Sequence, residues 1–76
     1  MDKKIIDDLK TAKEFVEING RRDTTKEIAE EIQGYLSEAI EAAENDDVDG
    51  VIAALDAIDK KAVPGWDLTS RIRDQL

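Results

Sequence analysis

Carboxylates are the side chains of this chain that are numerous enough to do chemistry, and most of them lie in one stretch. Between Lys26 and Lys60 the sequence has no positive side chain, and the acidic residues there are Glu27, Glu30, Glu31, Glu38, Glu41, Glu44, Asp46, Asp47, Asp49, Asp56 and Asp59. An ordinary helical surface mixes both signs, because opposite charges one turn apart attract. A surface of one sign creates a field that steers charged partners. The chemistry on offer is cation binding, carboxylate catalysis or recognition of a basic surface.

The pattern for cation binding begins at Asn45. Asn45, Asp47 and Asp49 take the first, third and fifth places of a twelve-residue segment, with Gly50 at the sixth and Asp56 at the twelfth. This spacing resembles the calcium loop of EF-hand proteins, which implies oxygen ligands for calcium at those places.

The segment departs from the EF-hand pattern at both ends. Its first place is Asn rather than Asp, and its twelfth is Asp rather than the longer, bidentate Glu. Charged residues also stand in the flanks where that family has apolar ones, at Glu44, Lys60 and Lys61. We favour the alternative that Asp46, Asp47 and Asp49 form an acidic cap at the start of a helix, where they suit the helix dipole. No metal site is expected.

Catalysis is not expected either. The chain has 76 residues, a formal charge of −8, no Cys and no His, so the commonest general base and metal ligand is absent. Catalysis by two carboxylates needs a pocket that so small a domain rarely forms. We expect one domain over residues 1–76, no cofactor, a cytoplasmic location and no membrane contact. An acidic chain is repelled by nucleic acid and by anionic lipid, so direct binding to either is not expected.

Four helices are predicted to position the carboxylates. The first covers about 3–18 and ends at Asn19-Gly20, and the second runs from a Thr24–Glu27 capping box to about Glu44. The third follows the acidic cap and ends before Pro64-Gly65, and Asp67 caps a short last helix. The short connections predict an all-α, compact antiparallel bundle of three longer helices plus a short C-terminal helix.

Each predicted helix has an apolar stripe at helical spacing. The stripes are Ile5, Ile6, Leu9, Ala12, Phe15 and Val16; Ile28, Ile32, Tyr35, Leu36, Ala39, Ile40 and Ala43; Val48, Val51, Ile52, Leu55, Ile58 and Ala62; and Leu68, Ile72 and Leu76. The third helix also has alanines on its other side, which predicts a central position in the bundle. Trp66 is predicted to plug one end of the bundle with its indole N–H near the surface, and its alternative role is an interface anchor. Arg71 and Arg73 are expected to be solvated.

The acidic residues of the second helix fall on the face opposite its apolar stripe. With the acidic cap they form the candidate partner-binding set, which is Glu27, Glu30, Glu31, Glu38, Glu41, Glu44, Asp46, Asp47 and Asp49. Carboxylates one helical turn apart stand ~5–6 Å from each other, a spacing comparable to that of phosphates along a DNA strand. The leading hypothesis is an inhibitor that mimics DNA and binds a basic protein, such as a nucleic-acid-binding protein or a nuclease. Phage inhibitors, immunity proteins and antitoxins use such surfaces.

Three alternatives remain open at this point. In the first, the acidic face is only a solvated surface that keeps the protein soluble. In the second, the chain is a structural or regulatory module that oligomerises or docks through an apolar face. The third alternative is an acyl carrier protein, because an acidic helical domain of this length with a central serine resembles that family. Their prosthetic-group serine lies in Asp-Ser-Leu at a helix start, whereas Ser37 stands in Tyr35-Leu36-Ser37-Glu38 inside a predicted helix. The identity of the partner and the oligomeric state are left open.

Overall fold

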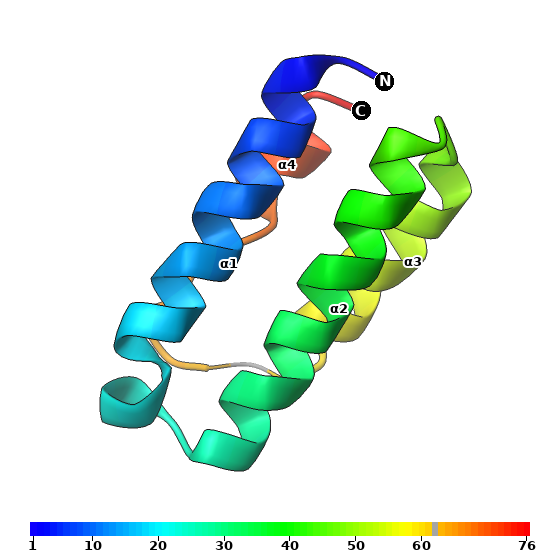
Figure 1. Cartoon of the computed structure of the whole chain (residues 1–76). Helices are drawn as coiled ribbons and strands as arrows, with labels where there is room; N and C mark the ends of the chain where they lie inside the picture. Colours follow the sequence, from blue (N-terminus) through cyan, green and yellow to red (C-terminus); the bar gives the residue numbers. More distant parts are fainter. Residues whose placement is uncertain (62) are drawn as a thin grey trace.

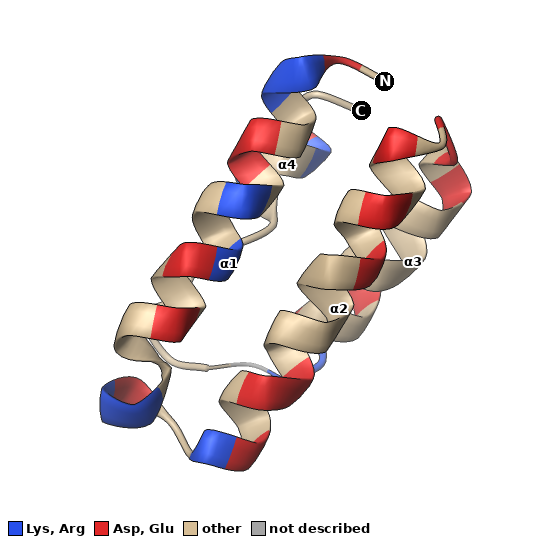
Figure 2. Ribbon diagram, viewed as in Figure 1, with Lys and Arg blue, Asp and Glu red and all other residues tan. Residues whose placement is uncertain are grey.

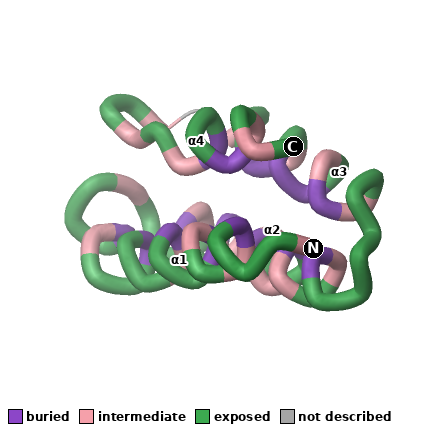
Figure 3. Tube along the Cα trace, turned by 90° about the horizontal axis from the view of Figure 1, so that it is seen from above, coloured by how far each residue is buried: buried purple, intermediate pink, exposed green. Residues whose placement is uncertain are grey.

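Helices are the regular secondary structure in the computed structural model, which describes residues 1–61 and 63–76. The elements are α1 (Lys3–Asp23), α2 (Lys26–Glu44), α3 (Val48–Asp59) and the short α4 (Ser70–Arg73). α1, α2 and α3 run antiparallel in succession (Figure 1). α1 and α2 lie side by side in one layer, and α3 and α4 lie over them in a second layer (Figure 3). The prediction of a compact all-α bundle of three longer helices and a short C-terminal helix is confirmed.

The central helix is α2 and not α3, so that prediction is wrong. α2 packs against both α1 and α3. The alanines of α3 misled the prediction, because a small apolar side chain can stand at the surface at little cost. Ala53 is exposed and Ala57 is half-buried, whereas Ala54 belongs to the core.

The core is formed by one stripe from each helix. Its buried side chains are Ile5, Leu9, Ala12, Val16, Ala29, Ile32, Leu36, Ala39, Ala43, Val51, Ala54, Leu55, Ile58 and Ile72. Val48 of the predicted third stripe is 44% exposed, and Ile52 is half-buried. Leu76 of the last stripe is 43% exposed. Ala62 lies outside the described residues.

The first two helix boundaries differ from the prediction. α1 continues through Asn19-Gly20 to Asp23, and Gly20 is buried within it. A Cβ added at Gly20 would lie 2.6 Å from the Cβ of Ala29. Gly20 therefore permits close approach of α1 and α2, and it does not end the helix. The cap of α2 is Thr25 rather than Thr24, with the Thr25 hydroxyl accepting from the Ile28 N–H at 3.1 Å.

The acidic cap of α3 is confirmed. The Asp47 carboxylate accepts from the Gly50 N–H at 3.0 Å. Since α3 begins at Val48, most of the segment compared above with a calcium loop is helix. In the part of the chain that the structure describes, no group of three or more acidic side chains is placed to hold a metal ion.

α3 ends at Asp59, well before Pro64-Gly65. Pro64 and Gly65 form a turn in which the Trp66 N–H donates to the Val63 carbonyl at 3.2 Å and Gly65 has φ +83°. Proline followed by a glycine with positive φ is the type II pattern. The cap residue of α4 is Thr69 and not Asp67, but the Asp67 carboxylate accepts from the N–H of Ser70, the first residue of that helix, at 3.2 Å. None of the described helices is long and apolar enough to cross a membrane.

Candidate protein-binding surface

The acidic residues of α2 lie opposite its buried stripe, as predicted. Ala29, Ile32, Leu36, Ala39 and Ala43 face the core. On the other side the glutamates are exposed except Glu31, which is half-buried. Figure 2 shows acidic positions along α2 and around the turn into α3, and the one basic position on α2 is its first residue, Lys26.

The candidate residues form two clusters rather than one continuous face. The N-terminal acidic cluster is Glu27, Glu30 and Glu31. The C-terminal acidic cluster is Glu38, Glu41 and Glu44 of α2 with Asp46, Asp47 and Asp49 of the turn and first turn of α3. The rise of an α-helix puts ~10 Å of axis between Glu31 and Glu38. No acidic residue stands in that interval, which contains the exposed Gly34.

The N-terminal acidic cluster is partly neutralised by lysines. Lys26 Nζ lies 3.9 Å from Glu30 Oε1, one helical turn away. Lys61 forms an ion pair with Glu31, and this carboxylate raises the pKa of the Lys61 ammonium. The sequence did not indicate the Lys61–Glu31 pair, because the two residues are distant along the chain and meet only when α3 docks on α2.

The C-terminal acidic cluster has much less compensation. Within the described part of the chain, no ammonium or guanidinium lies at ion-pairing distance from Glu38, Glu41, Glu44 or Asp49. The other two aspartates have local roles: Asp47 caps α3, and Asp46 lies beside the Met1 amino group. Glu41 and Glu44 also stand in the last turn of α2, where the helix dipole disfavours negative charge by roughly 0.3–1 kcal/mol each.

The backbone beneath this cluster is rigidly packed. Leu36, Ala39 and Ala43 on the opposite side of the same turns have no exposed surface. The carboxylates of Glu38, Glu41 and Glu44 are therefore displayed from a fixed rod with ~4.5 Å of axial rise between successive members. Like charges carried at fixed backbone positions suit a partner whose cations also stand in a row.

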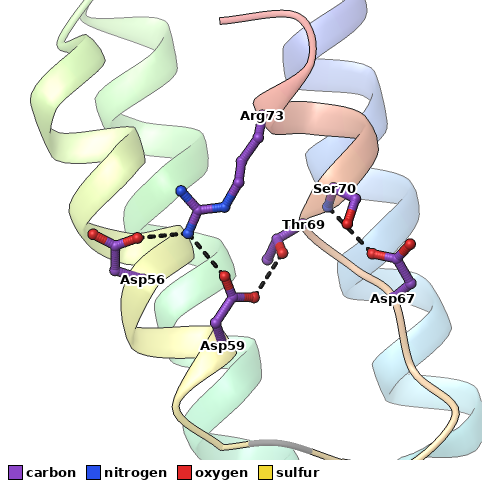
Figure 4. A network of polar contacts seen from close by, with 6 residues as sticks. All are labelled: Asp56, Asp59, Asp67, Thr69, Ser70 and Arg73. Atoms are coloured by element: carbon purple, nitrogen blue, oxygen red, sulfur yellow. Dashed lines mark hydrogen bonds and ion pairs between the residues drawn. The ribbon is translucent and has the colours of Figure 1, made fainter.

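Two acidic residues of α3 that lie outside the candidate set, Asp56 and Asp59, are paired (Figure 4). Arg73 Nη2 lies 2.5 Å from Asp56 Oδ1 and 2.8 Å from Asp59 Oδ2. The Thr69 hydroxyl donates to Asp59 Oδ1 at 2.6 Å, and Thr69 is buried. The two carboxylates raise the pKa of the Arg73 guanidinium. The expectation that Arg73 is solvated is wrong, because the segment after α3 folds back over that helix.

Trp66 lies near the C-terminal end of α1. Its indole N–H donates to Asp23 Oδ2 at 3.0 Å, and its ring packs edge-on against Phe15 with centroids 5.4 Å apart. This agrees with the predicted plug whose N–H is near the surface. Phe15 is 39% exposed and is not a core residue, contrary to the prediction. The buried stripe of α1 includes Ala12 and Val16 on either side of Phe15, but not Phe15 itself.

A scan against protein-family models and searches of curated proteins and of solved structures find no match to this chain.

Proposed function

We propose that this chain is a non-enzymatic protein-binding inhibitor that presents its C-terminal acidic cluster to a basic groove of a partner protein. The observation that carries the proposal is the uneven use of carboxylates. Asp56, Asp59 and Glu31 have cationic partners within the chain, whereas Glu38, Glu41 and Glu44 have none among the described residues. Like charges one turn apart repel by a few tenths of a kcal/mol, so this arrangement costs stability unless a partner uses it.

The partner class follows from the geometry of the charges. A basic groove built to hold a phosphate backbone presents fixed cations along a line. A rigid helix with successive carboxylates offers such a groove a comparable row of anions. A nucleic-acid-binding protein or nuclease is therefore the proposed kind of partner, and inhibition would come from occupying its nucleic-acid site. Phage inhibitors, immunity proteins and antitoxins are the functional classes that fit this action.

The experiment compares two matched pairs of charge-neutral substitutions. One variant carries Glu38→Gln and Glu41→Gln in the C-terminal acidic cluster, and the control carries Glu14→Gln and Glu17→Gln on the exposed surface of α1. Glu31 is left unchanged because it pairs with Lys61. Both variants change the net charge equally, and Gln keeps helix propensity.

The partner is first identified by pull-down from a lysate of the source cells, and association rates are then measured across a range of salt. We expect the variant in the acidic cluster to associate several-fold more slowly at low salt, while the control associates like the parent. The variant should be at least as stable as the parent, since a repulsion is removed. Equal association rates for both variants at every salt concentration would leave the acidic cluster as a solvated surface only.

A second candidate function is docking through an apolar surface. The observation in its favour is that Ile18 is 71% exposed and Phe15 is 39% exposed, one turn apart on α1. Ile18→Ser would then weaken binding at all salt concentrations, because apolar association is not screened. Charge-driven binding would instead be insensitive to Ile18→Ser and would weaken steeply as salt rises.

A further inference from the structure

The C-terminal segment, residues 63–76, contributes little to the buried core. Of the buried hydrophobic side chains, Ile72 is the one that comes from this segment, and Val63, Trp66 and Leu68 are partly buried against the core. Leu9, Leu36 and Leu55, one from each long helix, have no exposed surface. The apolar contacts that join α1 to α2 and α2 to α3 are therefore made without the C-terminal segment.

Polar contacts to carboxylates hold the C-terminal segment in place. The donors are the Trp66 indole, the Thr69 hydroxyl, the Arg73 guanidinium and the Gln75 amide. Their acceptors are Asp23 at 3.0 Å, Asp59 at 2.6 and 2.8 Å, Asp56 at 2.5 Å and Asp8 at 2.7 Å. Among the described residues, the other polar side-chain contacts between positions ten or more apart are the ion pairs of Lys61 with Glu31 and of the Met1 amino group with Asp46. Arg73 is the principal clasp, because it bridges two carboxylates of α3 (Figure 4).

Hollows that are open to solvent lie on both sides of the segment. One of about 280 Å³ lies between it and α2 and α3, beside the contacts of Thr69 and Arg73 with Asp59, with Ile32, Ile58 and Val63 in its lining. A second hollow of about 440 Å³ lies against α1, lined in part by Ala12, Phe15 and Ile72. Leu68 lines both hollows, so this part of the segment is flanked by open space. A segment with few buried apolar contacts and exposed polar ones is the kind that opens locally before the whole protein unfolds.

We propose that the C-terminal segment is a detachable strap. When the Arg73 clasp is released, residues 63–76 leave the bundle while α1, α2 and α3 stay folded, and the apolar groove beside Ile32, Ile58 and Ala12 is uncovered. This two-state device is separate from the proposed binding of a basic partner, because its contacts involve none of the residues of the C-terminal acidic cluster.

Native-state hydrogen exchange on the full chain tests the strap. The reporters are the amides of Arg73 and Asp74, which donate to the Thr69 and Ser70 carbonyls at 2.9 and 3.0 Å. The reference is the amide of Leu36 in the middle of α2. In the parent we expect the strap amides to be less protected than Leu36 by on the order of tenfold or more. Arg73→Gln should raise the exchange rate of the strap amides by a further factor on the order of ten, with little change in the exchange rate of the Leu36 amide.

Two further variants make the result decisive. Arg71→Gln is the control, because it removes the same charge from the same helix. In the described structure the Arg71 side chain makes no hydrogen bond or ion pair, so the strap amides of this variant should exchange as in the parent. Asp56→Asn breaks the clasp from the side of α3, and it should reproduce the effect of Arg73→Gln in a weaker form. The proposal would be overturned if the exchange rates of the strap amides and of the Leu36 amide rose by the same factor in these clasp variants. The segment would then leave the bundle only by global unfolding. Equal effects of Arg71→Gln and Arg73→Gln would also overturn it.

Discussion

Replacing Gly20 by alanine should destabilise the protein, whereas the same substitution at Gly34 should stabilise it. A Cβ at Gly20 would lie 2.6 Å from the Cβ of Ala29, and a Cβ at Gly34 would meet nothing within 4 Å. Both glycines lie inside long helices, and the glycine with positive φ is Gly65. The backbone conformation therefore suits alanine at both places, and the difference between them comes from packing alone.

The magnitude follows from two opposing contributions. Alanine in place of glycine inside a helix favours folding by ~1 kcal/mol. At Gly20 this gain is opposed by overpacking, which costs ~1–3 kcal/mol in well-packed sites. Carbon atoms prefer to be ~3.5–4.0 Å apart, so α1 and α2 must separate by about 1 Å there, and neither Cβ can rotate away. We expect Gly20→Ala to lose up to ~2 kcal/mol and Gly34→Ala to gain ~1 kcal/mol.

Circular-dichroism melts and urea denaturation measure this difference. In a domain of this size 1 kcal/mol corresponds to roughly 4–8 °C in Tm, so the two variants should differ by at least about 4 °C. Adding Ala29→Gly to Gly20→Ala removes the clashing atom, and in that background the Gly20 substitution should become favourable. If Gly20→Ala raises Tm as much as Gly34→Ala does, the two helices do not touch at Gly20 and the reasoning is refuted.

Three further predictions test other parts of the structure. Leu55→Ala should cost ~2–5 kcal/mol in urea denaturation, because Leu55 has no exposed surface, and a loss below ~1 kcal/mol would contradict its place in the core. Millimolar calcium should move Tm by no more than about a degree, because Asp47 is engaged as the cap of α3, and a rise of several degrees would restore the calcium-site interpretation. The hydrogen bond from the Trp66 N–H and, to a lesser extent, Arg22 lower the pKa of the Asp23 carboxyl. The contact between Trp66 and Asp23 should therefore persist as the pH falls to about 4 and be lost only below that, as the folded-state pKa of Asp23 is crossed. Trp66 fluorescence should report this acid transition in the parent, and Asp23→Asn should abolish it.

Local features of the fold could be read from the sequence. The stripe containing Leu9 and Val16, the cap at Asp47 and the turn at Pro64-Gly65 depend on residues within a turn or two of each other. Helical periodicity and capping act over that range, so they can be recognised without knowing the fold. The position of the glutamates opposite the apolar stripe of α2 follows from the same periodicity.

Boundaries were less predictable where two helices meet. Gly20 has the residue type of a helix end, yet it lies inside α1 because Ala29 of the neighbouring helix needs the space. The cap of α2 at Thr25 instead of Thr24 follows from the extra length of α1. The identity of the central helix was likewise decided by how the helices pack. The alanines of α3 are typical of a buried helix, yet some of them lie on a partly exposed surface.

The sequence by itself determined the helices, their apolar stripes and the row of carboxylates along α2, because each depends on spacing along the chain. Only the tertiary structure decided which carboxylates are neutralised. Lys61 meets Glu31, Arg73 meets Asp56 and Asp59, and Trp66 meets Asp23 after α3 docks on α2 and the C-terminal segment crosses the bundle. Coulombic attraction and hydrogen bonding act over a few ångströms in space and are indifferent to sequence separation. The contrast between paired and unpaired acids, on which the proposed function rests, is therefore a property of the folded chain.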